Sequence, residues 1–283
     1  MYTLLLLMLK IQSKEHRIKI FNRINYTSSA IVYKAIDEDS DDELAIKVER
    51  NQNTKSLLNE IKIAKFLGNN SGIVKLIDYG FYENKRFLVF PYFTKSLYKT
   101  LLNKKQLFNC AKQIISTLEY IHSKGIVHCD ISSKNVLCSQ NMNNFHLTDF
   151  GQSSHFNYTF EDVKSDELVG SPTYCSHHIH KYYEYMPRDD LISLGYLLFY
   201  CTTGTLPWCG MKTCREIKEK KIEFMDSHWN TEIPKELKIY FNYAFHLGMN
   251  EKPDYQILIK LFSDEERRER RASKNNNVLT IPI

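Results

Sequence analysis

Two short segments carry residue types that could bind a metal ion next to a phosphate group. The first, IVHCDISSKNVL (residues 126–137), contains Asp130 and Asn135. The second, FHLTDFG (residues 145–151), contains Asp149. Carboxylate and amide oxygens are the hard ligands that Mg²⁺ prefers, and the ion also takes phosphate oxygens. The two segments therefore indicate magnesium and phosphate chemistry.

Length and composition fit one two-lobed domain or two small domains. The chain has 283 residues, of which 43% are hydrophobic and 13% aromatic, so it can bury a large core. The net charge of +5 permits an acidic partner without requiring nucleic acid. Seven cysteines are present, an odd number without CxxC spacing, which argues against a disulfide framework or zinc site and favours a reducing compartment.

An apolar run, LLLLML, occupies residues 4–9 near the N-terminus. It is too short to span a bilayer. A signal peptide would have Lys or Arg before the apolar run, and none is present here. We expect it to form a buried strand or helix on the first lobe. Since no other segment approaches transmembrane length, a soluble, intracellular protein without direct membrane contact is expected.

The hydrophobic pattern predicts an α+β chain with two unlike lobes. Alternating segments predict strands within residues 17–50 and two more within 72–93, and a helix is expected over 54–67, ending at Gly68. The predicted C-terminal helices cover 96–103, 107–124, 188–203, 213–219, 234–248 and 254–262. The predicted division is an extension (1–16), a β-rich N-lobe (17–92), a helical C-lobe (93–264) and a charged tail (265–283), with a hinge near residues 91–93.

Three long motifs give the chain a family resemblance. They are RDDLISLGYLLFYCTTGTLPWCGM (188–211), EKPDYQILIKLF (251–262) and GSPTYCSHHIH (170–180). With the two segments above, they resemble a eukaryotic protein kinase of the casein kinase I group, over residues 20–262. The VHxDI sequence resembles the vaccinia-related branch, which includes poxviral kinases. The resemblance implies a bilobal protein-kinase fold, and the degenerate positions resemble a poxviral paralogue that has diverged toward a pseudokinase.

The resemblance assigns roles to five residues that are present in the expected order. Lys47 matches the strand lysine that neutralises the α- and β-phosphates of the nucleotide, and Glu60 matches the helix acid that orients it. Asp130 matches the acid that accepts the substrate hydroxyl proton. Asn135 and Asp149 match the magnesium ligands. Five matches in order argue for the fold, although not for activity.

The glycine loop of the family is degenerate in this chain. The pattern G-x-G-x-x-G-x-V aligns with NYTSSAIV, so that Asn25, Thr27 and Ala30 replace the three glycines. Glycine lets the backbone approach the phosphates closely and take unusual dihedral angles. Each replacement adds a Cβ atom, so we expect a looser cradle that binds a triphosphate poorly.

The catalytic loop has two further replacements. Ser132 occupies the position of the family's catalytic-loop lysine, which lies beside the transferring γ-phosphoryl group. Losing a cation there costs about 2.7–4 kcal/mol of transition-state stabilisation, by analogy with an oxyanion-hole donor. Lys134 is close in sequence but is expected to point elsewhere. Cys129 replaces the loop arginine, so a phosphorylated activation loop is not clamped by that residue; a reactive thiol is an alternative without support.

We expect the chain to keep a site that can recognise adenine, but a narrower one than in the family. Phe90 matches the gatekeeper and is bulky. Pro91 cannot donate a hydrogen bond, although its carbonyl can accept one. The backbone N–H of Phe93 is available to adenine, which places Phe93 in the degenerate nucleotide site with Lys47 and Glu60.

Two polar clusters have open interpretations. His177, His178 and His180 are interpreted as loop residues on the substrate side, with metal binding a minor alternative. The segment EERRERR (265–271) is either a solvated helix end or a nuclear import signal.

The resemblance implies a pseudokinase that acts by protein–protein interaction and modulates vaccinia-related kinase signalling during poxvirus infection. Expected partners are active vaccinia-related kinases, viral or host, or their substrate barrier-to-autointegration factor, in the host nucleus and cytoplasm. No cofactor is expected, with MgATP as the alternative, and nucleic acid is not an expected partner. The rival function is a weak Ser/Thr kinase that uses Lys47, Asp130, Asn135 and Asp149. A nucleotide-sensing scaffold is a third possibility.

Overall fold

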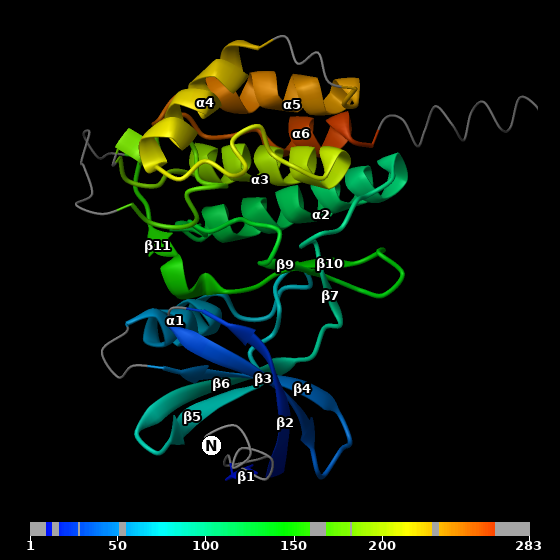
Figure 1. Cartoon of the computed structure of the whole chain (residues 1–283), viewed down its shortest axis with the longest axis vertical. Coiled ribbons are helices and arrows are strands. Elements are labelled where there is room, and N and C mark those ends of the chain that lie inside the picture. Colours follow the sequence, from blue (N-terminus) through cyan, green and yellow to red (C-terminus); the bar gives the residue numbers. More distant parts are fainter. Residues whose placement is uncertain are drawn as a thin grey trace, which may run out of the picture.

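A computed structural model of the chain has two lobes, one built around a β-sheet and the other around helices (Figure 1). It describes residues 10–12 (backbone only), 17–27, 29–50, 55–158, 168–181, 183–227 and 232–263. The apolar run at residues 4–9 and the segment 265–271 lie outside the described residues.

The N-lobe sheet has six antiparallel strands in the order β1-β2-β3-β4-β6-β5. Their bounds are β1 (Lys10–Gln12), β2 (Arg17–Tyr26), β3 (Ala30–Asp37), β4 (Glu43–Glu49), β5 (Asp78–Tyr82) and β6 (Lys85–Pro91). β1 lies in the segment that the sequence assigns to an extension, where it pairs with β2. Residues 38–42 connect β3 to β4, and the two strands predicted within 72–93 are confirmed as β5 and β6.

Helix α1 (Ser56–Leu67) packs on the sheet and ends where the sequence predicts. Leu57, Ile61 and Leu67 are buried. Gly68 follows the helix with φ of 68°, in the left-handed region that glycine adopts at low cost. Glu60 is polar, but it lies among the buried residues of the same helix.

The C-lobe contains the helices α2 (Lys104–Ser123), α3 (Pro187–Thr203), α4 (Cys214–Asp226), α5 (Lys235–His246) and α6 (Tyr255–Leu261). Five of the six predicted helices are confirmed, although α4 extends seven residues beyond its predicted end at residue 219. The remaining elements are short: the strands β7 (Lys95–Ser96), β8 (Ile126–Val127), β9 (Val136–Cys138), β10 (Phe145–Leu147) and β11 (Ser154–His155), and two 3₁₀ turns, η2 (Phe150–Gln152) and η3 (Ile179–Lys181). In the described part of the chain, no helix is both long and apolar enough to cross a membrane.

The prediction of a helix over residues 96–103 is wrong. Ser96 belongs to β7, and Lys99 has φ of 55°, which an α-helix excludes. The backbone N–H of Leu97 donates to Val136 and that of Leu102 donates to Cys201. Distant segments therefore satisfy this backbone, and the apolar residues that suggested a helix instead anchor an irregular segment.

A buried lysine of α4 anchors the segment that precedes α3. Lys221 is fully buried, and its Nζ donates to the carbonyl oxygens of Pro172 and Cys175 at 2.6 Å each. It also lies over the rings of Tyr196 and Trp208. Burial lowers the pKa of Lys221 to about 8, so the ammonium form at neutral pH depends on these acceptors.

Replacing Lys221 with methionine should therefore destabilise the C-lobe. Lys221→Met keeps most of the side-chain volume but leaves the carbonyl of the buried Cys175 without its ammonium donor, which costs about 1–3 kcal/mol. Urea unfolding would measure the change. The matched control is Lys220→Met, since Lys220 pairs only with Glu223 at the surface, where a pair contributes about 0–1 kcal/mol. Equal midpoints for the two variants would contradict the anchoring role.

Candidate nucleotide and phosphotransfer site

Three residues from different elements meet in an ion triad between the lobes. Lys47 on β4 is only 6% exposed, and its Nζ lies 2.7 Å from Glu60 Oε2 on α1. The same Nζ lies 2.7 Å from Asp149 Oδ1, just before η2. The structure thus brings together three of the residues to which the resemblance assigns nucleotide and magnesium roles.

The ion triad has one cation for two carboxylates. Burial raises the pKa of Glu60 to about 7, and the attraction of Lys47 only partly opposes this effect. For Asp149, burial also acts to raise the pKa, but Lys47 outweighs it and the pKa is lowered. Burial acts to lower the pKa of Lys47, yet the two carboxylates raise it overall. The triad is therefore short of positive charge, which a divalent cation at Asp149 would supply.

A buried carboxylate fixes the catalytic loop. Asp190, at the start of α3, accepts hydrogen bonds from the backbone N–H of His128 at 2.7 Å and of Cys129 at 3.0 Å. Cys129 has φ of 66°, a left-handed conformation that is uncommon outside glycine. The His128 ring also packs against Phe150, with centroids 4.8 Å apart. These contacts determine where Asp130 projects.

Both carboxylate oxygens of Asp130 accept internal hydrogen bonds. Asn135 Nδ2 donates to Oδ2 at 2.8 Å, and the backbone N–H of Ser171 donates to Oδ1 at 3.0 Å. Burial raises the pKa of Asp130, while these donors partly oppose the shift. A substrate hydroxyl would therefore have to compete with Asn135 and Ser171 for this acceptor.

No lysine replaces the missing cation of the catalytic loop within the part of the chain that the structure describes. Ser132 is 6% exposed, and its short side chain carries no charge. Lys134 is exposed, and its Nζ lies 5.3 Å from the centroid of the Tyr98 ring. As the sequence indicates, Lys134 points away from the position that the family's lysine occupies.

The degenerate glycine loop has internal hydrogen-bond partners for the backbone N–H groups of Tyr26, Thr27 and Ala30. The N–H of Thr27 donates to the carbonyl of Ala30 at 2.9 Å, and the N–H of Ala30 donates back to Thr27 Oγ1 at 3.0 Å. The N–H of Tyr26 donates to Asn25 Oδ1 at 2.8 Å. Arg50 holds the turn from β4's end, donating to the Thr27 carbonyl at 2.8 Å and lying over the Tyr26 ring. These three backbone donors are therefore already used inside the protein.

The loop is also tied to α1 by packing. Ala30 is fully buried in a cluster with Leu57 and Ile61 of that helix. The Cβ atom that replaces the third glycine thus contributes to the N-lobe core. Restoring a glycine at this position would remove that contact as well as open the turn.

The hinge region has an apolar environment. Phe90 is buried, and Ala45, Phe93 and Leu137 pack as partly buried residues against the same cluster. Pro91 ends β6 and pairs with Leu44.

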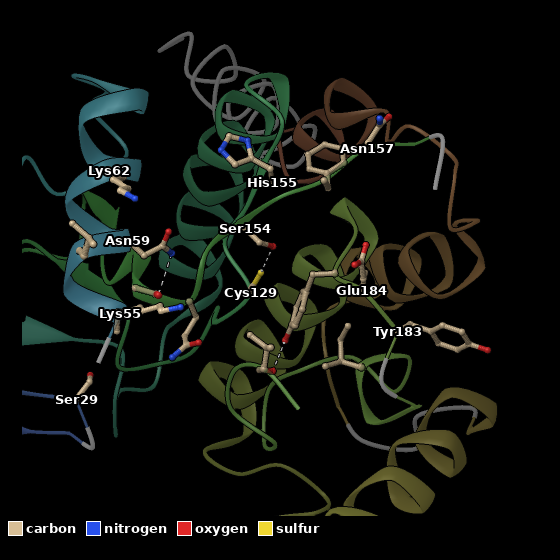
Figure 2. A pocket seen from close by; sticks show the side chains of 18 residues that line it. Ser29, Lys55, Asn59, Lys62, Cys129, Ser154, His155, Asn157, Tyr183 and Glu184 are labelled. Carbon is tan, nitrogen blue, oxygen red and sulfur yellow. Dashed lines mark hydrogen bonds between the residues drawn. The ribbon is translucent and has the colours of Figure 1, made fainter. Parts of the chain in front are cut away.

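Sequence reasoning missed a large groove beside α1 (Figure 2). It has a volume of about 1200 Å³ and lies between α1 and the segment 151–157, with Cys129 among its lining residues. Asn59 Nδ2 crosses one side of it to the carbonyl oxygens of Gly151 and Ser153. The Cys129 thiol is 2% exposed and lies 3.5 Å from Ser154 Oγ, and burial raises its pKa, so no reactive thiolate is expected.

Two members of the histidine cluster, which the sequence assigns to a loop on the substrate side, are buried. They are His177 and His180, and His180 Nε2 lies 3.1 Å from Lys221 Nζ. Burial lowers the pKa of each to about 4, so both are neutral at physiological pH. Within the described residues, no group of three or more His, Cys, Asp or Glu side chains could hold a metal ion.

A two-lobed molecule with a lysine–glutamate–aspartate triad at the junction defines a protein-kinase fold. The protein kinase domain family matches residues 23–276, and the chain belongs to this family. The fold is similar to the solved structure of vaccinia related kinase 3, with a TM-score of 0.75 and 20% identity over 91% of this chain and 89% of that chain. The fold is therefore that of a protein kinase, as the resemblance predicts.

Replacing Glu60 with glutamine should change the pH dependence of stability. The pKa of Glu60 is about 7 in the folded protein and near 4.5 when unfolded, so the folded state binds the proton more tightly. This stabilisation is complete below about pH 4.5 and is lost as the pH rises to 7. The wild type should therefore lose about 1–3 kcal/mol relative to Glu60→Gln across this range. Unfolding midpoints at several pH values would measure it, and parallel curves would contradict it.

Proposed function

We propose that this chain is a pseudokinase that acts by binding other proteins. The observation that carries the proposal is the closed turn at Thr27 and Ala30. The N–H groups of Thr27 and Ala30 bond to one another's acceptors, whereas a phosphate cradle presents such groups to the nucleotide. Opening the turn would cost hydrogen bonds that MgATP must replace, so nucleotide binding is weak.

The catalytic loop supports the same proposal. Ser132 provides no cation for the spreading negative charge of phosphoryl transfer, which depends on such groups. Asp130 is engaged by Asn135 and Ser171, so its oxygens are not presented to a substrate without rearrangement. Each feature lowers the rate independently of nucleotide affinity.

A weak Ser/Thr kinase is the second candidate function, and the ion triad favours it. Lys47, Glu60 and Asp149 already have the distances of charge-assisted hydrogen bonds. The residues expected to bind magnesium, Asn135 and Asp149, provide the oxygen atoms that the ion prefers. The magnesium ion of MgATP therefore fits the residues expected to bind it, whereas the phosphates of MgATP fit the closed turn at Thr27 and Ala30 poorly.

The partner in this proposal comes from the resemblance to the vaccinia-related branch. We propose that the chain binds active vaccinia-related kinases, viral or host, or their DNA-bridging substrate barrier-to-autointegration factor. It would thereby modulate this signalling during poxvirus infection, in the host nucleus and cytoplasm.

Nucleotide binding should be weak in the wild type and improve when the turn is opened. A ligand at 100 times its dissociation constant stabilises a protein by about 2.7 kcal/mol, which a melting curve detects readily. We expect no clear shift with sub-millimolar MgATP for the wild type and a shift for Asn25→Gly/Thr27→Gly, which retains Ala30. Thr27→Val is the control that removes the hydroxyl but keeps a branched side chain. A clear wild-type shift would overturn the proposal of weak binding.

Association with the partner should survive loss of the catalytic residues. Lys47→Met and Asp130→Ala remove chemistry, so co-precipitation with an active vaccinia-related kinase or barrier-to-autointegration factor should be unchanged. Radiolabel transfer to casein, measured on the same preparations against Asp149→Ala, should stay at background. If the wild type labels casein and Asp149→Ala does not, the weak-kinase alternative replaces this proposal.

A further inference from the structure

Two segments of the chain that contain no acidic residue come together beside the catalytic loop. Residues 85–118 and 131–148 include neither Asp nor Glu. Strand β7 of the first segment pairs with β9 of the second, with Lys95 opposite Cys138 (Figure 1). The resulting surface therefore concentrates positive charge without internal neutralisation.

Three exposed lysines of this surface lie outside the ion pairs of the described residues. Lys134 and Lys99 each place Nζ within 6 Å of the same Tyr98 ring centroid, at 5.3 and 5.5 Å. Lys95 Nζ donates to the carbonyl of Gln140 at 3.2 Å. A ring and a carbonyl attract an ammonium group but leave its charge unpaired. We call Lys95, Tyr98, Lys99, Leu101 and Lys134 the lysine–tyrosine surface.

Two local features in this region lower the stability of the free protein. Lys99 has φ of 55°, a conformation that costs energy for a residue other than glycine. Lys104 and Lys105 begin α2, whose first turn contains no acidic residue. The positive end of a helix dipole favours acidic residues, so lysines there are unfavourable. Positive charge held in place at a cost to the free chain indicates a function that uses it.

An apolar component lies within the same surface. Tyr98 is 48% exposed and Leu101 is 64% exposed, and both line a shallow cavity of about 400 Å³ together with Lys95. A ligand here would meet unpaired ammonium groups close to two exposed apolar side chains, Tyr98 and Leu101, in a depression that is otherwise lined mostly by polar residues. An acidic polypeptide segment with one apolar side chain matches both features.

We propose that the lysine–tyrosine surface binds an acidic segment of a partner protein, with an apolar residue of that segment seated against Tyr98 and Leu101. Single-stranded nucleic acid fits less well, because it requires several aromatic platforms and this surface offers one exposed ring. The chemistry of the partner follows from this surface alone. The cellular role of the binding rests on the proposed function, in which the chain acts by binding other proteins. The binding itself does not depend on whether the chain transfers phosphate.

Binding of a short fluorescein-labelled peptide of Glu and Asp around one Leu tests this proposal. Anisotropy would be measured with the full chain in the absence of nucleotide. Because like charges oppose binding, Lys99→Glu/Lys134→Glu should weaken affinity about tenfold or more. Tyr98→Ala should also weaken it. The charge-matched control is Lys212→Glu/Lys252→Glu, which changes exposed lysines elsewhere and should bind like the wild type. Melting curves would establish that each variant is folded.

Three outcomes would overturn the proposal. The first is no preference of the wild type for the acidic peptide over its Gln and Asn counterpart. The second is equal weakening in the control variant, which would indicate a response to net charge alone. The third is tighter binding of oligothymidylate than of the peptide, which would assign the surface to nucleic acid. None of these outcomes bears on catalysis, and a transfer-active wild type would leave the peptide result standing.

Discussion

The buried carboxylate of Asp190 is the constraint on which the arrangement of the site depends. It accepts the backbone N–H groups of His128 and Cys129, and His122 Nε2 of α2 lies 2.9 Å from it. One side chain thereby joins α2, α3 and the catalytic loop inside the C-lobe. Since a buried carboxylate needs donors on its oxygens, these contacts must form together. The left-handed conformation of Cys129 is maintained by this requirement, whichever side chain occupies the position.

A second polar set joins the two lobes, and it does so without a nucleotide. Lys47 bonds to Glu60 of α1 and to Asp149 before η2, so that sheet, helix and C-lobe segment share one ammonium group. Asn59 adds hydrogen bonds from α1 to the backbone of Gly151 and Ser153. The junction is thus stabilised by the protein's own groups. Its closed geometry is consequently no measure of catalytic activity.

The sequence predicts this fold well because its long apolar patterns and motifs are local. Helix α1 ends at Gly68 as its pattern indicates, whereas residues 96–103 are not helical, because Leu97 and Leu102 find backbone partners in distant segments. The replacement of a glycine by Thr27 is visible in the sequence, but the hydrogen bond from Thr27 Oγ1 that closes the turn depends on one rotamer. Burial of His177 likewise depends on the packing of elements far apart in the chain.

The residues retained and lost in the site differ in what they do for the folded protein. The ion pair of Lys47 and Asp149 joins the two lobes. Asn135 fixes the conformation of the catalytic loop, because its Nδ2 donates to both the carboxylate and the backbone carbonyl of Asp130. Removing any of these would leave a buried polar group without its partner. The glycines and the catalytic-loop lysine have no such duty, because their family role is toward the nucleotide. Their replacement by side chains that pack or bond internally, such as Ala30, adds stability to the free protein. The retained residues are therefore those that the fold requires. A binding function requires only the folded protein, whereas phosphotransfer also requires the residues that contact the nucleotide.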